Sequence, residues 1–506
     1  MSSTPGRSPG GTQVLVVGAG PVGLSLAVDL ARRGIAVRII DTLAQPTDES
    51  RAIVVHSRTL DHFEALGVLD AIMGQAIMST GMEVHSDGRT IAAVDFDHIH
   101  AVHPYSVSLV QSETEAILAA RLVQLGVAVE RFSTLTSYVA GQNHVDATIT
   151  GPGEKTRTVR VQFLVGADGA RSTVRHLMGQ ELGGSFAGED VLLGDVDAAH
   201  DYAQSHFHAF FSPGQTTALL FPLRGSRVRV FAQLPAGTDP ARPVTDDWLQ
   251  SVADERGLKM RITRSHWLTR FELKHGQTRR YRAGRVFLAG DAAHIHSPAG
   301  ALGMNTGIQD SINLGWKLAT ALRNEGCERL LDSYHLERHP IGAQVVAITT
   351  QITKIATLKN PLAQRLRNTL MHFGVHAAPL MDRMADTIEQ QRVHYRDSPV
   401  VNGTGRSLRP GDFLYLPGTH VAAADDHVAI VLPGDGPAAK PTGLPALIVP
   451  AGDIDVLKDA AGLAHGGIVI VRPDGYIGHI GADTQHANDL YRQSFTVGAS
   501  PGGQTS

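Results

Sequence analysis

A glycine-rich turn near the N-terminus has the spacing of a dinucleotide-binding site. It lies in the segment VLVVGAGPVG and comprises Gly18, Gly20, Pro21, Val22 and Gly23. The first glycine permits a tight turn, the second lets the backbone approach a pyrophosphate, and the third lets helix and strand pack closely. The N-terminus of the helix that follows offers unpaired N–H groups and the positive end of its dipole to phosphate.

An acidic residue, Asp41, ends the strand predicted after that helix. A carboxylate at this place can accept hydrogen bonds from both ribose hydroxyls and repels a 2′-phosphate, so this site disfavours NADP. The turn and the acid together indicate a bound dinucleotide, but they do not distinguish NAD from FAD.

Two further motifs each place an aspartate directly after a buried strand. FLVGADGARSTVR contains Asp168, followed by Arg171 and Arg175, and taken alone it could be an ordinary Asp-Gly turn. RVFLAGDAAHIHSPAG contains Gly290 and Asp291, and the aspartate is placed to hydrogen-bond the ribityl hydroxyls of a flavin.

The loop after the second motif suits a planar ring. Pro298 and Gly300 have little bulk, so a ring could lie close to the backbone there. Gly303, Met304 and Asn305 begin a predicted helix whose N–H groups would face the pyrimidine edge of a flavin, where negative charge gathers on reduction. The two motifs together favour FAD over NAD.

The elements that would position these residues alternate between strands and helices, which predicts an α/β protein. Residues 13–17, 36–40 and 285–289 are predicted as buried strands, with a helix at 24–33 between the first two. The other predicted elements are helices at 58–73, 113–125 and 306–325, β-structure at 134–150, 158–165 and 190–235, a mostly helical segment at 330–395 broken at Pro340, Pro361 and Pro379, and apolar strands at 427–433, 445–450 and 467–480.

Composition excludes several other classes of protein. The net charge of −4 gives no electrostatic reason to expect a nucleic-acid partner, and no apolar run is long enough for a membrane span. The single cysteine, Cys327, excludes intramolecular disulfides and a CxxC redox pair and fits a cytoplasmic location. No HExxH or Cys/His spacing indicates a metal site.

The three motifs, in this order, resemble those of the class A flavoprotein monooxygenases, the family of p-hydroxybenzoate and phenol hydroxylases, over about residues 12–395. The resemblance implies that Arg51 and Gln111 contact FAD. It also implies a Rossmann-like FAD domain, a β-sheet substrate domain and a C-terminal thioredoxin-like domain. We expect these at 12–175 plus 276–396 with a helical extension, at 176–275 with strands from about 76–110, and at 405–506.

The C-terminal likeness rests on GRSLRPGDFLYL and IVIVRPDGYIGHI, which are similar to the last domain of phenol hydroxylase and of aromatic polyketide hydroxylases. A catalytic thioredoxin needs two nearby thiols, which this segment lacks. We therefore expect a structural domain. Related enzymes are often dimers or larger, so the resemblance also implies a homo-oligomer.

For the reaction, the resemblance implies FAD as cofactor and NADPH or NADH as a transient co-substrate without its own Rossmann domain. Reduced flavin and O₂ would form a C4a-hydroperoxide that hydroxylates an aromatic, phenolic small molecule, such as a polycyclic phenol of secondary metabolism. Phe221, Pro222 and Phe231 are candidates for an apolar substrate wall, although each could be plain sheet core. Tyr281 resembles a tyrosine that hydrogen-bonds the phenol in phenol hydroxylase, with Arg279 beside it.

The sequence departs from the family at two places. Relatives often have Gly-Gln-Gly where this chain has Ala301, Leu302 and Gly303, and phenol hydroxylase has an acid in the stretch matching the apolar residues 53–55. The sequence therefore identifies no catalytic base. His56, His294 and His296 are candidates, but histidines near such motifs are more often local hydrogen-bond partners.

Other chemistries share this fold. Baeyer–Villiger oxidation, epoxidation and antibiotic inactivation by hydroxylation are alternatives that only the product would distinguish, and a non-catalytic FAD-binding protein is another. Flavin-dependent halogenation is disfavoured because Trp248, Trp267 and Trp316 do not form the Trp-x-Trp-x-Ile-Pro segment of that family.

Overall fold

The structure is a computed structural model of the 506-residue chain. It describes residues 11–47, 52–96, 99, 101–211, 216–235, 237–296, 299–356, 360, 363–364, 386–387, 389–416, 426–434, 444–447 and 449–496. Two predicted flavin contacts, Arg51 and Pro298, lie outside the described residues, as do the predicted helix breaks at Pro361 and Pro379. Within the described ranges, no helix has the length and apolar character needed to cross a membrane.

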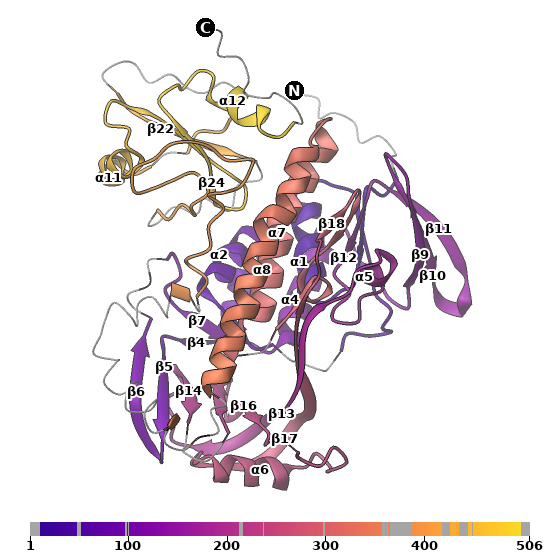
Figure 1. Cartoon of the computed structure of the whole chain (residues 1–506), viewed down its shortest axis with the longest axis vertical. Coiled ribbons are helices and arrows are strands. Elements are labelled where there is room, and N and C mark those ends of the chain that lie inside the picture. The colour runs from indigo at the N-terminus through magenta and orange to yellow at the C-terminus, as the bar shows by residue number, and fades with distance from the viewer. Residues whose placement is uncertain are drawn as a thin grey trace.

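A six-stranded sheet carries the glycine turn (Figure 1). Its strands, in sheet order, are β18 (Arg282–Ala283), β19 (Val286–Leu288), β12 (Phe163–Gly166), β1 (Val14–Val17), β2 (Val37–Ile40) and β8 (Val129–Glu130). All neighbours are parallel except β18 and β19. The central strands β1 and β12 are apolar runs buried along their whole length, as expected for parallel strands covered on both faces.

Helices and a small antiparallel sheet surround this core. The helices are α1 (Pro21–Arg32), α2 (Ser57–Leu66), α3 (Leu69–Met73), α4 (Gln111–Gln124), α5 (Thr173–Leu177), α7 (Leu302–Arg323) and α8 (Glu328–Ala356). The small sheet comprises β9 (Thr134–Ala140), β10 (Val145–Thr150) and β11 (Thr156–Val161). Its apolar residues Leu135, Val145 and Ile149 belong to the same hydrophobic core as β1 and β12.

An eight-stranded sheet forms the second large unit, seen at the lower part of Figure 1. Its strands, in sheet order, are β20 (His294–Ile295), β17 (Met260–Gln277), β13 (Gly183–His200), β16 (Arg227–Gln233), β15 (Ala218–Pro222), β14 (His206–Phe210), β5 (Gly81–Ser86) and β6 (Arg89–Asp95). Helix α6 (Asp246–Glu255) packs Trp248 and Leu249 into the core on one face of this sheet. A short three-stranded sheet comprises β3 (Val54–Val55), β7 (Ser106–Ser108) and β4 (Ile77–Ser79), in this order. In the chain, β3 and β4 precede β5, and β7 follows β6.

The C-terminal part folds around a four-stranded sheet. It lies beside the end of α7 and the start of α8, away from the eight-stranded sheet (Figure 1). Its elements are β21 (Asn402–Gly403), β24 (Ile477–Gly481), β23 (Gly467–Val471), β22 (Val428–Leu432), α11 (Ala451–Ala461) and α12 (Ala487–Gln493). The predicted strand at 445–450 is wrong for its described residues, which form only an isolated bridge between Ala446 and Ala429.

Two predicted helices differ from the structure for physical reasons. The helix expected at 58–73 is divided because Gly67 adopts a left-handed conformation, with a φ of 71°, and ends α2. Pro340 does not break α8, although it removes one backbone donor. The turn of the helix before the proline carries the buried residues Glu337 and Arg338, which form ion pairs with Lys317 and Asp310.

A buried charge cluster joins the C-terminal domain to helices α7 and α8 of the core around the six-stranded sheet. Glu337 of α8 accepts hydrogen bonds from Lys317 Nζ at 2.7 Å and from both terminal nitrogens of Arg472 at 2.9 Å. Arg472 also pairs with Asp474, which accepts a hydrogen bond from the indole N–H of Trp316 at 3.0 Å. Burial alone would raise the pKa of Glu337, but the charges of Arg472 and Lys317 hold it well below its usual range.

We predict that Glu337→Gln lowers the free energy of unfolding by about 3 kcal/mol or more, because it leaves buried cations uncompensated. The effect should be full above the ordinary glutamate pKa of about 4.3 and should shrink as the pH falls from there toward the depressed pKa of folded Glu337, because the unfolded wild-type protein then gains a proton that the folded protein does not. Urea unfolding of both proteins at several pH values measures this difference.

The matched control is Glu328→Gln on the same helix, whose partner is Arg282 and whose side chain is 55% exposed. A pair whose carboxylate is largely exposed to water contributes at most about 1 kcal/mol. Equal effects of the two substitutions would contradict the role assigned to the buried cluster.

Candidate functional site

Two adjoining cavities extend from the glycine turn to the eight-stranded sheet. Their volumes are about 400 and 440 Å³. Both are lined by Gly20, Thr47, Gln111, Ala167 and Gly169, so they form one continuous cleft. We call the part at the glycine turn the first cavity and the part at the sheet the second cavity.

The three glycines of the turn have different surroundings. Gly18 has a φ of +103°, and a Cβ there would lie 2.4 Å from the carbonyl oxygen of Ala167. A Cβ on Gly23 would lie 1.9 Å from the carbonyl oxygen of Gly18, so this position lets α1 pack on the turn. At Gly20 the nearest atom to an added Cβ is 4.0 Å away. Only the middle glycine therefore borders open space, where a pyrophosphate would need room.

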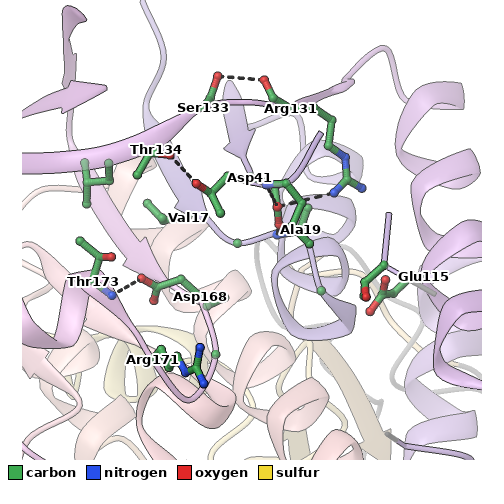
Figure 2. Close-up of a pocket in the computed structure, with 18 of the residues that line it drawn as sticks. Val17, Ala19, Asp41, Glu115, Arg131, Ser133, Thr134, Asp168, Arg171 and Thr173 are labelled. Atoms are coloured by element: carbon green, nitrogen blue, oxygen red, sulfur yellow. Dashed lines mark hydrogen bonds and ion pairs between the residues drawn. The ribbon is translucent and has the colours of Figure 1, made fainter. Parts of the chain in front are cut away.

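Polar groups at the outer end of the first cavity could hold a ribose (Figure 2). Asp41 accepts hydrogen bonds from the N–H groups of Ala19 and Leu43, both at 2.8 Å, and its carboxylate lies 3.7 Å from the guanidinium of Arg131. Ser133 lines the cavity beside them. Helix α1 begins without a side-chain cap, so its first N–H groups are available to a phosphate.

Asp168 and Gln111 line the first cavity but already have protein partners. Asp168 accepts hydrogen bonds from Ser172 at 2.5 Å and from the N–H groups of Thr173 and Val174, so it fixes the start of α5. Burial raises the pKa of Asp168, and these hydrogen bonds oppose that rise. Gln111 bridges the N–H of Ala52 and the side chain of Glu115.

The second cavity begins at the N-terminus of α7. Gly303 and Met304 line it, together with Asp291 from the turn after β19 and with Pro21 and Val22 from α1. Helix α7 starts after Ala301, which has a φ of 53°, and it has no side-chain cap. Its first N–H groups can therefore meet a negatively charged ring edge.

Some predicted flavin contacts instead hold the backbone that surrounds the cleft. Asn305 is fully buried: its amide donates to the carbonyl of Val54 and accepts from the N–H of His56, both at 2.9 Å. It ties α7 to β3 and is absent from the cavity lining. Gly290 and Gly23 are likewise absent from both linings. A Cβ on Gly290 would lie 2.8 Å from Val22.

One face of the eight-stranded sheet closes the second cavity. Phe221 and Phe231 line the second cavity, as the sequence predicted. Five further residues line it that were not predicted: Leu193, Leu219, Arg229, Phe271 and Leu273. The alternation of strand side chains explains this set, because Leu219 and Phe231 are opposed in the register of β15 and β16. Pro222 follows Phe221 in β15, is buried and is absent from the lining. Strand-by-strand alternation is the signal that would have found these residues.

Arg229 is a buried cation in this wall. Its guanidinium pairs with Asp195, with Nη2 at 2.8 Å, and donates to the carbonyl of Ala52 at 3.1 Å. Asp195 and Arg229 are directly opposed on β13 and β16. Asp195 also pairs with Arg227, and the hydrogen bond from Arg229 to Ala52 links the sheet to the segment that follows β2.

The structure places the two predicted catalytic residues away from the second cavity. Tyr281 is fully buried, accepts a hydrogen bond from Gln277 at 2.7 Å and stacks on His294. Burial and the charge of Asp310 raise the pKa of Tyr281 well above its ordinary value. Arg279 lines a third cavity, with His176 and residues 179–183. Neither residue is among those lining the cleft.

The three candidate bases also differ in position. His56 donates from Nε2 to the carbonyl of Gly300 at 2.9 Å, and its Nδ1 lies 2.8 Å from Ser106 Oγ. His294 pairs with Asp310 at 2.8 Å. His296 alone of the three lines the second cavity.

Comparisons with known proteins agree with this geometry. A family model described as "FAD binding domain" matches residues 11–349. The chain is 34% identical to 6-methylpretetramide 4-monooxygenase of Streptomyces rimosus, over 92% of this chain and 90% of that protein. It is 34% identical to a rifampicin monooxygenase of Streptomyces venezuelae, over 71% and 75%. The solved structure of OxyS anhydrotetracycline hydroxylase from Streptomyces rimosus matches with a TM-score of 0.74 and 29% identity, over 96% and 99%.

The different surroundings of two glycines give a paired prediction. Gly20→Ala should change the free energy of unfolding by less than about 1 kcal/mol, because its φ of −77° suits alanine and its Cβ meets open space. It should weaken FAD binding by about tenfold or more, because the added methyl enters the path of a pyrophosphate. Flavin fluorescence during titration of the apoprotein measures the affinity.

Gly18→Ala is the matched comparison. It should destabilise the fold by about 2 kcal/mol or more, because alanine is strained at positive φ and would meet backbone atoms. Unchanged FAD affinity in a folded Gly20→Ala protein would contradict the assignment of this turn.

Proposed function

We propose a function from the premise that this chain belongs to the FAD binding domain family of flavin-dependent aromatic monooxygenases. The protein is an FAD-dependent aromatic hydroxylase that inserts one oxygen atom of O₂ into its substrate. The observation that carries this function is the continuous cleft, which joins a dinucleotide-type turn to an apolar cavity against a β-sheet.

The residues of the cleft fit FAD along its length. Asp41 would bind the adenosine ribose, and the backbone at Gly18 and Gly20, with the N-terminus of α1, would hold the pyrophosphate. Asp291 would bind the ribityl chain, and Gly303 and Met304 would face the flavin ring. When bound, FAD supplies the redox chemistry that activates O₂.

The chain's own residues orient the aromatic substrate and exclude water. The apolar wall contains Leu193, Leu219, Phe221, Phe231 and Phe271, opposite the N-terminus of α7. A flat ring bound between this wall and the flavin site would displace water from the second cavity, which limits unproductive consumption of reducing equivalents. His296 is a polar side chain in its lining that can set the orientation of a substrate hydroxyl.

The substrate class we propose is a polycyclic phenol of secondary metabolism. The second cavity's volume of about 440 Å³ lies in the range of small-molecule sites. Three of the similar proteins bear the names of enzymes acting on 6-methylpretetramide, anhydrotetracycline and rifampicin, and another is named for pentachlorophenol. Reduction of the FAD by NADPH or NADH follows from the family resemblance, and the nicotinamide nucleotide would bind only transiently.

We also propose that the C-terminal domain has the thioredoxin-like fold and a structural role. Support comes from its central strands β22, β23 and β24 and from the helices α11 and α12. The chain's one cysteine, Cys327, precedes α8 and lies outside this domain, so a dithiol reaction cannot occur there.

The test is to purify the FAD-loaded protein and follow NADH and NADPH oxidation with a panel of phenols and polycyclic aromatics. We expect oxidation that accelerates with one class of aromatic and a product 16 mass units heavier, a value set by the added oxygen atom. A new ring hydroxyl in the product identifies hydroxylation, whereas a ring-expanded ester or an epoxide identifies the alternative oxygen chemistries. Protein that cannot retain FAD contradicts the proposal.

Phe231→Ala tests the apolar wall. It should raise the KM for the aromatic substrate by about tenfold and increase the share of reduced nicotinamide that yields H₂O₂, because a truncated wall admits water. Coupled assays of product and H₂O₂ measure both. The control is Val230→Ala, a buried neighbour in β16 whose side chain belongs to the core on the opposite face. Equal uncoupling in both variants would contradict the placement of the substrate.

A further inference from the structure

Three potential metal ligands meet near one end of the eight-stranded sheet, on two adjacent strands that are far apart in sequence. Glu83 and His85 lie on β5, and His208 lies on β14. The two strands pair in parallel with His208 directly opposite Glu83. Residues two apart on a strand share a face, so all three side chains project to the same side.

The three ligand atoms have the spacing of a metal coordination sphere. His85 Nε2 lies 3.1 Å from His208 Nδ1, and the same oxygen of Glu83 lies 3.5 Å from the first nitrogen and 3.6 Å from the second. A tetrahedral zinc ion with ligand distances of about 2.0–2.2 Å keeps its ligand atoms about 3.3–3.6 Å apart. A zinc ion could therefore be accepted with shifts of a few tenths of an ångström.

Neighbouring groups orient both imidazoles for such a role. His208 Nε2 donates to the carbonyl of Ala203 at 2.9 Å, which leaves the lone pair of Nδ1 directed at the cluster. His85 Nδ1 lies 3.3 Å from Thr90 Oγ1, an acceptor for its proton when Nε2 binds a metal, and its ring stacks on Phe210 with centroids 4.8 Å apart.

We propose that Glu83, His85 and His208 bind one zinc-class divalent cation, with water as the fourth ligand. His208 is fully buried, whereas the Glu83 side chain is 27% exposed, so the open position faces solvent through the glutamate. Imidazole nitrogens with one carboxylate select zinc over magnesium, which requires oxygen ligands.

The position of the site indicates a structural role. His208 is opposite Leu220 in the β14–β15 register, and Leu220 belongs to the core under α6, whereas Leu219 and Phe221 line the second cavity. The ion would therefore lie on the face away from the substrate. It would fasten β5, which comes from the N-terminal part of the chain, to the edge of the sheet formed by residues 183–277.

The test uses the full-length, FAD-loaded protein without a polyhistidine tag. Equilibrium dialysis against zinc, with metal and protein measured in the same sample, should give one tightly bound ion per chain, no competition from a hundredfold excess of magnesium, and a higher midpoint of thermal unfolding. Cobalt(II) in place of zinc should give the intense visible absorption of a tetrahedral site.

Glu83→Gln keeps the size of the side chain and should weaken zinc binding at least tenfold, and His208→Ala should abolish it. His206→Ala is the matched control, because His206 shares the strand and face of His208 but lies outside the cluster. Circular dichroism checks that each variant folds. Wild-type protein that binds no zinc, or a folded Glu83→Gln protein that binds zinc as the wild type and the control do, would overturn the proposal.

Discussion

The close approach of α1 and α7 is the constraint on which the cleft depends. A Cβ on Gly307 would lie 2.6 Å from Val22, and one on Gly315 would lie 2.2 Å from the carboxylate of Asp29. Bare backbone at these two positions of α7 lets the helices touch along two turns. Val22, at the first turn of α1, also fills the space beside Gly290. The contact therefore fixes the uncapped N-termini of both helices relative to each other, that of α1 where the two cavities meet and that of α7 in the second cavity.

The cleft also depends on contacts between the core around the six-stranded sheet, which contains α1 and α7, and the eight-stranded sheet that faces these helices. Arg229 reaches from the sheet to the carbonyl of Ala52, and Asp310 holds the turn at Gly290 while it pairs with Arg338 of α8. In helix α8, Glu337 contacts Arg472 of the C-terminal domain, and the adjacent Arg338 reaches the turn at Gly290 through Asp310. This arrangement gives a domain without redox thiols a part in holding the cleft together.

The parts of the fold and of the cleft that could be predicted from the sequence are those formed by residues close together in the chain. The glycine turn, Asp41 and the motifs at Asp168 and Asp291 are local, because strand, turn and helix are consecutive there, and the structure brings all of them to the cleft. The apolar wall of the second cavity needed the register of four strands, β13, β15, β16 and β17, which the β-rich segment at 190–235 did not reveal. Tyr281 directly precedes the hairpin of β18 and β19. Its burial against residues of α8 could not be inferred from the sequence around it.

The two faces of the eight-stranded sheet carry separate tasks. In β15 and β16, one residue in two packs into the core under α6, and the residue between faces the second cavity. A lineage can therefore exchange Leu219, Phe221 or Phe231 for side chains of other shapes while the residues that keep the sheet folded stay in place. Substitution of single residues in such a wall can change the shape of the second cavity without unfolding the sheet. The sheet is therefore the part of the molecule most open to evolutionary change, whereas backbone contacts fix the rest of the cleft.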